Sequence, residues 1–371
     1  MTSVLVVNAG STSLKLSLLD SADTVTSAVE LDPWDGTPDH PELRDFLTSN
    51  GTGVVLGHRV VHGGGRFREA VVIDSSVLAG IDELTDLAPL HQPRALAGIK
   101  ATERLLPGVP AVACFDTAFH ADLPPAAAGY ALPADWTSRF GLRRFGFHGL
   151  SHAYASRRAA EILDADVADL RIVSCHLGGG ASLCAIRDGR SVDTTMGFTP
   201  LEGLVMATRS GSVDPGLLMW LQQSGGIDVA DVSSGLEQRS GLAGLAELPD
   251  GSGDMREVRA AADAGAGAAR LAIEVYVHRL RREIAAMAAA MNGLDALVFT
   301  GGVGEYHWQI RAAAAEGLGF LGVELDAGRN SATADAEIGS PSARVRTLVV
   351  TAREDIEIAR QTRLALRQPD G

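Results

Sequence analysis

The chain has 371 residues, of which 46% are hydrophobic and 21% are charged. This apolar content excludes a disordered chain, and the length is enough for two or three domains. The net charge of −14 argues against nucleic-acid binding, which needs a basic face, and no apolar run approaches the roughly 20 residues of a membrane span. The N-terminus does not resemble a secretion signal, and Cys114, Cys175 and Cys184 show no CxxC spacing. These features predict a cytoplasmic protein with reduced, buried thiols.

Two segments far apart in the chain show the same strand–turn–strand pattern. Residues 4–7 are apolar, residues 8–13 form a turn cluster, and apolar residues then alternate with polar ones over 14–18. The pattern returns at 172–186, around the glycine-rich turn 176–180. A repeated unit predicts two similar domains, although two unrelated hairpins would also explain it.

Elsewhere the chain alternates short apolar runs with helical patterns, which favours an α/β fold. We predict strands at 54–57, 109–114, 296–299 and 347–350, and helices at 153–164, about 265–291, from 308 and from 355.

Three glycine-rich turns follow predicted strands, at residues 8–13, 176–180 and 301–304. Backbone N–H groups in such turns bind anions, and the hydroxyls of residues 11–13 add further donors. The three turns together indicate a polyphosphate site, although neither a P-loop nor a GxGxxG motif is present. Lys15, one of only two lysines, follows the first turn. It is either a point charge beside a phosphate or a solvated strand residue.

Five further residues are candidates for chemistry. Arg59 lies in a locally basic segment and could bind a carboxylate through its guanidinium. Asp116 ends an apolar strand and could be a base or a metal-network residue, but the sequence alone favours a helix N-cap. His148, in a turn rich in glycine and aromatic residues, could stabilise charge or be structural. Arg209 stands among hydroxyls and glycines, as suits a transferring phosphoryl group. Glu354, like Asp355 beside it, could bind Mg²⁺ directly or through water, or simply complement a helix dipole.

Taken in order, these segments resemble the acetate kinase family. The matching stretches are NAGSTSLK, GHRVVHGG, FDTAFH, FGFHGLSH, HLGGG, TPLEGLVMATRSGSVDP, FTGGVGE and the Arg353-Glu354-Asp355 tail. The resemblance implies an α/β fold of two duplicated ribonuclease H-like domains, as in the actin, Hsp70 and sugar kinase superfamily. We expect an N-terminal domain of residues 1–120 plus 352–371, and a C-terminal domain of residues 121–351.

The resemblance also implies phosphoryl transfer between ATP or ADP and acetate, with Mg²⁺ or Mn²⁺, by a homodimer without nucleic-acid or membrane partners. Asp116, His148 and Arg209 match catalytic residues of the family, and Arg59 matches the residue that holds the carboxylate. Asn8 and Glu354 match its magnesium-site residues. The residues that match nucleotide contacts are Lys15, His176, Leu177, Gly178, Gly179, Gly180, Asp254, Met255, Arg256, Gly302, Val303, Gly304, Glu305 and Tyr306.

Three positions on the nucleotide side depart from the family pattern. Gly179 replaces an Asn, Tyr306 replaces an Asn, and Met255 replaces an aromatic residue. These changes leave two possible phosphoryl donors, ATP or another donor such as pyrophosphate. The sequence also does not distinguish acetate from propionate or other short acids as the acceptor. A nucleotide-dependent binding or regulatory protein is a further alternative. The central expectation is that the hairpin turns at Asn8 and His176 face one phosphate chain, with Arg59 and Arg209 beside it.

Overall fold

The computed structural model describes residues 2–10, 13–34, 36–37, 40–89 and 91–367. It divides into two compact units. Unit 1 comprises Met1–Ala121, Phe147–Tyr154 and Arg353–Gly371, and unit 2 comprises Asp122–Gly146 and Ala155–Ala352. Compared with the predicted division, the segment 147–154 belongs to the first unit. The predicted donor hydroxyls of Ser11 and Thr12 lie outside the described residues.

Unit 1 is built on a six-stranded mixed sheet with the strand order β3-β2-β1-β4-β6-β5. Its strands are β1 (Ser3–Ala9), β2 (Leu14–Leu19), β3 (Val25–Leu31), β4 (Val54–Val60), β5 (Val71–Val72) and β6 (Ala111–Phe115). Strands β1, β4 and β6 are parallel, and β2 pairs antiparallel with β1, as the alternating pattern after the first turn predicts.

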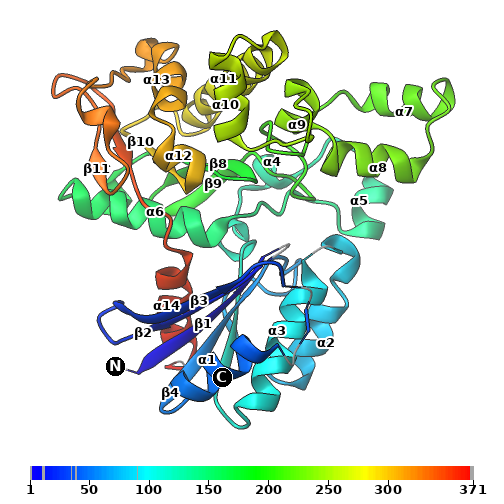
Figure 1. The fold of residues 1–371 in the computed structure, drawn as a ribbon, viewed down its shortest axis with the longest axis vertical. Helices are drawn as coiled ribbons and strands as arrows, with labels where there is room; N and C mark the ends of the chain where they lie inside the picture. Colours follow the sequence, from blue (N-terminus) through cyan, green and yellow to red (C-terminus); the bar gives the residue numbers. More distant parts are fainter. Residues whose placement is uncertain (1, 11–12, 35, 38–39, 90, 368–371) are drawn as a thin grey trace. The chain divides into compact units, whose positions relative to one another are not determined.

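Helices cover both faces of this sheet (Figure 1). They are α1 (Pro41–Asn50), α2 (Ser75–Asp82), α3 (Gln92–Leu105) and α14 (Glu354–Ala365), with the 3-10 turns η1 (Thr85–Leu87) and η2 (Ala118–His120). Because side chains alternate along a strand, Val4 and Val6 pack with Ile358 of α14, whereas Leu5 and Val7 pack in the cluster that includes Leu43 of α1. Burial on both faces explains the unbroken apolar run of β1.

Unit 2 contains a second six-stranded sheet, with the order β11-β12-β10-β7-β8-β9. Its strands are β7 (Ile172–Leu177), β8 (Ala181–Arg187), β9 (Arg190–Thr194), β10 (Ala296–Thr300), β11 (Ala336–Glu337) and β12 (Arg346–Val349). The 24-residue helix α11 (Gly267–Ala290) packs against β7, β8 and β9. It begins two residues later than the sequence pattern predicts.

The other helices of unit 2 are mostly short. They are α4 (Pro125–Ala128), α5 (Ala134–Phe140), α7 (Pro215–Gln223), α8 (Val229–Gln238), α9 (Gly241–Ala246), α10 (Met255–Asp263), α12 (Gly301–Tyr306) and α13 (Trp308–Glu316), with η3 (Val167–Asp169), η4 (Gly319–Leu321) and η5 (Arg329–Ser331). Helix α6 (Gly149–Ile162) begins in unit 1 and ends in unit 2. None of the helices in the described part of the chain is long and apolar enough to span a membrane.

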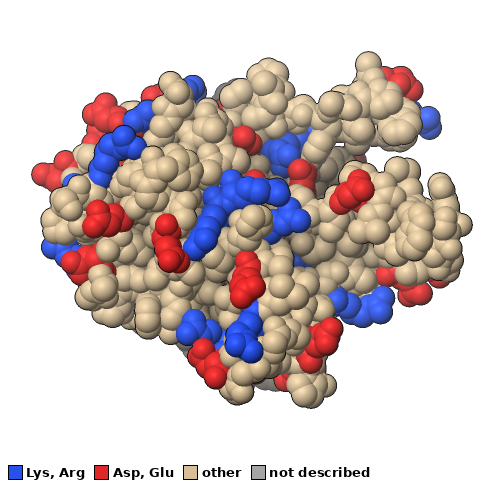
Figure 2. Space-filling view, turned by 90° about the horizontal axis from the view of Figure 1, so that it is seen from above, with Lys and Arg blue, Asp and Glu red and all other residues tan. Residues whose placement is uncertain are grey.

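The two sheets have the same topology, which confirms the predicted duplication. In each, a hairpin is followed by a third antiparallel strand, and two parallel strands extend the other side of the first strand. The hairpin β1–β2 thus corresponds to β7–β8. The three cysteines are buried free thiols, as predicted. Figure 2 shows basic and acidic side chains interspersed over one face of the molecule.

One predicted turn has a different structure. Residues 301–304 form the first turns of α12 rather than an open loop. Gly301 has a φ of +78°, and a Cβ there would lie 2.8 Å from the carbonyl oxygen of Leu177. Glycine lets the chain pass from β10 into the helix this close to β7.

Candidate active site

Four polar side chains meet at the carboxyl ends of the parallel strands of unit 1. Asn8 and Arg59 are the penultimate residues of β1 and β4, Asp116 follows β6, and Glu354 begins α14. The strands are neighbours in the order β1-β4-β6, so their carboxyl ends lie at one edge of the sheet. We call these four residues the carboxylate–arginine cluster.

Hydrogen bonds connect the four residues of the cluster to one another. The Arg59 Nη2 atom donates to Asp116 Oδ2 at 2.6 Å, and its Nε donates to both carboxylate oxygens at 3.1 and 3.2 Å. Arg59 Nη1 donates to Asn8 Oδ1 at 3.2 Å and lies 3.9 Å from Glu354 Oε2. The Asn8 amide donates to Glu354 Oε2 at 3.0 Å. The four residues therefore form one unit that can present charge in a fixed geometry.

The charges in this cluster are buried. Asp116 is 1% exposed and Arg59 is 15% exposed. Burial raises the pKa of the Asp116 carboxyl, and the Arg59 guanidinium opposes that rise. Arg59 remains protonated, because the charges of Asp116 and Glu354 outweigh the effect of burial and raise its pKa. Two carboxylates and one guanidinium leave the cluster with a formal charge of −1.

The N-cap role that the sequence alone favours for Asp116 is wrong. The residue that precedes the 3-10 turn η2 is Thr117, and no side-chain cap is formed there. The Asp116 carboxylate instead faces Arg59, which lies 57 positions away in the sequence. Local sequence could not reveal a partner on a different strand.

The backbone brings His148 next to Asp116. The N–H of Gly149 donates to the Asp116 carbonyl at 3.0 Å, and a Cβ on Gly149 would lie 2.1 Å from that oxygen. His148 itself has a φ of +56°, an unusual conformation for a residue with a side chain. The Nε2 atom of the buried His120 ring lies 3.0 Å from the carbonyl oxygen of Phe147. The turn is therefore held on both sides of His148.

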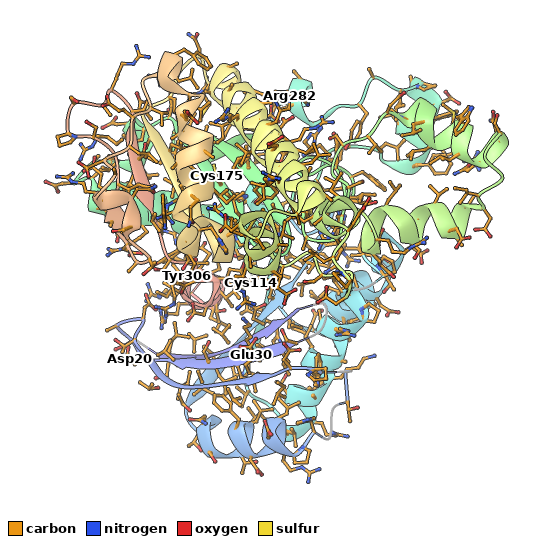
Figure 3. All side chains as sticks on the ribbon, turned by 45° about the horizontal axis from the view of Figure 1, so that its top comes forward. Asp20, Glu30, Cys114, Cys175, Arg282 and Tyr306 are labelled. Atoms are coloured by element: carbon orange, nitrogen blue, oxygen red, sulfur yellow. The ribbon has the colours of Figure 1, made fainter. Side chains whose placement is uncertain are left out.

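Lys15 lies on the same face of the sheet as Asn8, because the two residues are direct partners across the β1–β2 ladder. Its side chain is 60% exposed and lies 3.1 Å from Glu30, which is labelled on β3 in Figure 3. The structure thus places Lys15 in a surface ion pair and not within the carboxylate–arginine cluster.

Unit 2 contains a cavity of about 780 Å³. Eight of the residues that match nucleotide contacts line it: Gly178, Gly179, Asp254, Met255, Arg256, Gly302, Val303 and Tyr306. Six lining residues were not predicted: Ala207, Thr208, Leu242, Gly253, Tyr276 and His307. The wall thus combines glycine backbone with apolar and aromatic side chains, which suits a flat ring and a phosphate chain.

The cavity wall depends on close backbone contacts and on two aromatic side chains. A Cβ on Gly253 would lie 2.1 Å from the carbonyl oxygen of Ala207, so these two segments pack together only with glycine at 253. Tyr276 is 3% exposed, and its hydroxyl has no hydrogen-bond partner among the described residues. Tyr306 is 62% exposed (Figure 3). No local sequence signal marks Tyr276, because it lies inside the long helix α11.

Six residues predicted to contact the nucleotide do not line the cavity: Lys15, His176, Leu177, Gly180, Gly304 and Glu305. Glu305 has a structural part in the same region. Its Oε1 atom accepts hydrogen bonds from the backbone N–H groups of Gly301 at 3.0 Å and Ala352 at 2.9 Å, and burial raises the pKa of its carboxyl.

Asp254, which does line the cavity, accepts a hydrogen bond from the Arg256 N–H as the N-cap of α10. It also binds the Arg256 guanidinium, which lowers the pKa of the Asp254 carboxyl.

Arg209 is a half-buried cation in unit 2. Its Nη1 atom donates to the carbonyl of Pro200 at 2.9 Å, and within the described part of the chain no carboxylate lies at ion-pair distance from it. Burial lowers the pKa of the guanidinium, although an arginine still keeps its proton at neutral pH. Arg209 therefore forms no ion pair with a carboxylate of the described residues, although the charge of Glu237 acts on it, whereas Arg59 is paired with Asp116.

Comparison with known proteins yields a consistent set of relatives. The model of the acetokinase family matches residues 44–360. An acetate kinase from Leifsonia xyli is 44% identical over 393 residues, which cover 97% of this chain and 98% of that protein. The crystal structure of Porphyromonas gingivalis acetate kinase is 37% identical with a TM-score of 0.90, covering 99% of this chain and 100% of that one. A propionate kinase structure from Francisella tularensis is 36% identical with a TM-score of 0.89, covering 98% and 100%.

The fold is shared more widely than the sequence. A candidate N-acetylmannosamine kinase from Listeria monocytogenes has a TM-score of 0.50 at 12% identity, covering 98% of this chain and 100% of that one. At that identity the likeness concerns the fold alone. It agrees with the predicted α/β fold of two duplicated domains.

Proposed function

Because this chain belongs to the acetokinase family, whose members transfer a phosphoryl group to a carboxylate, we propose that it converts ATP and acetate to acetyl phosphate and ADP, reversibly. The observation that supports this best is the carboxylate–arginine cluster. Asn8 and Glu354 are 346 positions apart and are hydrogen-bonded to each other, and the Arg59–Asp116 pair completes the group. Such an arrangement suits a small anion and a cation at the same strand ends.

In the proposed reaction, a carboxylate oxygen attacks the γ-phosphorus in line. A carboxylate is already ionised at pH 7, so the reaction needs no strong general base. Arg59 holds the acceptor: Asp116 and Asn8 fix its guanidinium, and its Nη1 and Nη2 atoms each have one N–H beyond these bonds. Asp116 acts by fixing Arg59 and by adding negative charge to the cluster.

Catalysis then depends on neutralising the charge of the transferring phosphoryl group. Arg209 suits this role because no carboxylate within the described residues forms an ion pair with it. His148 adds a hydrogen-bond donor, and its turn is fixed by Gly149 and His120. Both residues act on the equatorial oxygens, where charge is spread in the transition state.

The donor set of the cluster fits Mg²⁺. The Asn8 amide and the Glu354 carboxylate offer oxygen ligands, lie within hydrogen-bond distance of each other and belong to a group with net negative charge. Within the described residues, no group of three or more His, Cys, Asp and Glu side chains forms a metal site by itself. Asn8 and Glu354 would hold the ion together with water and donor phosphates, and the ion would neutralise phosphate charge. Mn²⁺ would fit the same oxygen ligands.

The cavity of unit 2 supports a nucleoside triphosphate as donor. Pyrophosphate would leave the apolar and aromatic part of the wall, including Met255 and Tyr276, without a partner. The change at Gly179 leaves the cavity open, because even a Cβ there would meet no atom within 4 Å, and Tyr306 lines the cavity with a side chain that is 62% exposed. Pyrophosphate nevertheless remains the alternative donor that must be tested.

The acceptor is a short carboxylate, with acetate as the primary substrate and propionate as the alternative. One methylene changes binding by only about 1–3 kcal/mol in an apolar pocket, so both acids are expected to react at different rates. A matrix of donors (ATP, GTP, pyrophosphate) against acceptors (acetate, propionate, butyrate), with hydroxylamine trapping of the acyl phosphate, tests the proposal. We expect the highest kcat/KM with ATP and acetate. Absence of acyl phosphate with every pair would favour a binding or regulatory protein.

The protein is expected to act as a homodimer in the cytoplasm. Helices α7 and α8 expose several large apolar side chains, among them Trp220 at 58% and Val229 at 68%. A second copy of the chain would cover them. Light scattering should give a dimer mass for the wild type, and Trp220→Glu should lower it. Cys114, Cys175 and Cys184 form no disulfide, which is typical of a reducing compartment.

A further inference from the structure

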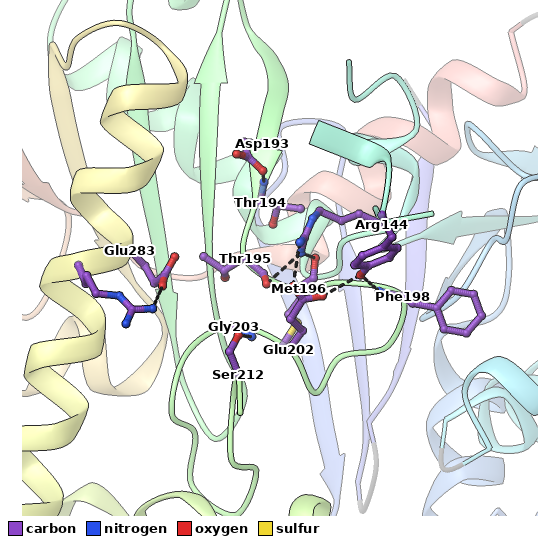
Figure 4. Close-up of polar contacts among 12 residues, drawn as sticks. Arg144, Asp193, Thr194, Thr195, Met196, Phe198, Glu202, Gly203, Ser212 and Glu283 are labelled. Atoms are coloured by element: carbon purple, nitrogen blue, oxygen red, sulfur yellow. Dashed lines mark hydrogen bonds and ion pairs between the residues drawn. The ribbon is translucent and has the colours of Figure 1, made fainter. Parts of the chain in front are cut away.

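A partly buried polar network lies next to the loop that carries Arg209. It consists of Tyr130, Arg144 and Glu202, all in unit 2. Figure 4 labels Arg144 and Glu202. Arg144 Nη2 donates to Glu202 Oε1 at 2.8 Å, and the Tyr130 hydroxyl donates to Glu202 Oε2 at 2.7 Å. Both oxygens of the carboxylate are thus engaged. We call these three residues the Glu202 network.

The network fixes the backbone of residues 195–198. Arg144 Nη1 donates to the carbonyls of Thr195 at 3.2 Å and Met196 at 2.9 Å. The N–H of Phe198 donates to the Tyr130 hydroxyl at 2.8 Å. Burial and the adjacent Glu202 raise the pKa of Tyr130 to about 12, so the hydroxyl keeps the proton that it donates.

Gly197 shows how closely the network packs on this segment. A Cβ at this position would lie 1.8 Å from Glu202 Oε2 and 2.3 Å from the Tyr130 hydroxyl. The Gly197 carbonyl also accepts hydrogen bonds from the N–H groups of Phe145 and Gly146, at 3.1 and 3.2 Å. The Glu202 carboxylate therefore occupies space that is open only because residue 197 is a glycine.

The same segment continues into the backbone that binds the Arg209 side chain. Pro200, two residues before Glu202, provides the carbonyl that accepts from Arg209 Nη1. Gly203 exchanges two hydrogen bonds with Ser212, both of 3.0 Å, so the two sides of the loop are paired directly after Glu202. The Met206 N–H donates to the Arg209 carbonyl at 3.1 Å. The orientation of the Arg209 side chain thus depends on where the backbone at 200–203 lies.

We propose that Glu202 is a positioning residue: held by Arg144 and Tyr130, it fixes the Pro200 carbonyl and through it the guanidinium of Arg209. This inference rests on the proposed role of Arg209 in phosphoryl transfer. The carboxylate neutralises Arg144 and not Arg209, so the loop gains a charge-assisted anchor while Arg209 keeps its full charge for substrate. A displacement of a catalytic group by about 1 Å can reduce the rate by about a hundredfold.

The test compares Glu202→Gln in two backgrounds, the wild type and Arg209→Lys. In the wild type we expect kcat to fall by about tenfold to a hundredfold, while the KM values for ATP and acetate change less than about twofold. In the Arg209→Lys protein the same change should lower kcat less than about twofold, because the group that Glu202 positions is already lost. Thermal denaturation of each variant confirms that it folds.

Tyr130→Phe provides a milder variant, because it removes the two hydrogen bonds of the hydroxyl, to Glu202 and from the Phe198 N–H, and leaves the charge-assisted Arg144–Glu202 pair intact. Its kcat should fall by a smaller factor than that of Glu202→Gln, again with unchanged KM values. Equal losses of kcat from Glu202→Gln in both backgrounds, or wild-type turnover in Glu202→Gln, would overturn the positioning role and leave the proposed reaction standing. Wild-type turnover in Arg209→Lys alone would instead overturn the proposed role of Arg209 and this inference with it.

Discussion

The two units hold their polar groups by different means. In unit 1, the carboxylate–arginine cluster is a set of side chains that bind one another, with Arg59 and Asp116 as its centre. In unit 2, the cavity wall is largely glycine backbone and apolar side chains, and the nearby Arg209 binds a neutral carbonyl. The first arrangement should be sensitive to the loss of side chains, and the second to the addition of a methyl group. Since the two sheets share one topology, the difference lies in the residues at and beyond the strand ends.

The largest effect is expected at Arg209, a half-buried cation that forms no ion pair with a described carboxylate. Arg209→Ala should lower kcat at least about a hundredfold, equivalent to about 3 kcal/mol of transition-state stabilisation, while the protein stays folded. Steady-state kinetics with circular dichroism measures both. Arg239→Ala, at an exposed arginine of the same unit, is the matched control. Turnover within about threefold of wild type in Arg209→Ala would remove its catalytic role.

A smaller effect on turnover, but a clear one on substrate binding, is expected at Arg59. Arg59→Ala should raise the KM for acetate at least about tenfold, because the proposed anion-binding group is gone. It should also destabilise unit 1, since Asp116 would remain buried without its partner, at a cost of about 3–5 kcal/mol. The control is Arg66→Ala, whose side chain is 52% exposed. A stable variant with an unchanged KM would show that Arg59 has no part in binding the acceptor.

In unit 2, a single methyl group should be enough to disturb donor binding. Gly253→Ala forces a Cβ against the Ala207 carbonyl, and we expect the KM for ATP to rise about tenfold while the KM for acetate stays the same. Gly267→Ala is the control, because a Cβ there meets no atom within 4 Å. Equal kinetics of the two variants would mean that the 207–253 contact does not shape the donor site.

The smallest effect concerns the pH dependence of stability. Burial lowers the pKa of His58 to about 3 and that of His120 to about 4, both below the unfolded value of about 6.5. Between these values the unfolded chain binds more protons than the folded one, so stability is full above pH 6.5 and falls as the pH is lowered. Each residue should account for about 2 kcal/mol of lost stability at pH 5. Urea denaturation at several pH values should show a shallower pH slope for His58→Gln than for the wild type; identical slopes would contradict the assignment.

The strands and the duplication could be predicted because they depend on the order of apolar, polar and glycine residues within short segments. The alternation after the first turn predicts β2, and its return at residues 172–186 predicts the second hairpin. The ordered motifs also lead to the family before any coordinates are considered. Much of the cavity wall can be predicted from the resemblance to the family, because eight of the residues matched to nucleotide contacts line it.

Contacts between residues that are distant in the chain could not be predicted from the sequence. The partner of Asp116 lies on another strand, so the local interpretation as an N-cap was wrong. Tyr276 reaches the cavity from the middle of a long helix, and Glu202 is bound by residues 58 and 72 positions away. The expectation that the turns at Asn8 and His176 face one phosphate chain stays a prediction.

The most direct measurement follows acetyl phosphate formed by the purified chain from ATP, Mg²⁺ and acetate, in the wild type and in Arg209→Ala. Our account predicts product that requires both substrates, together with a loss of kcat of at least about a hundredfold in the variant at a nearly unchanged KM for ATP. Hydroxamate formation that does not depend on added acetate, or that proceeds equally well in both proteins, would contradict it.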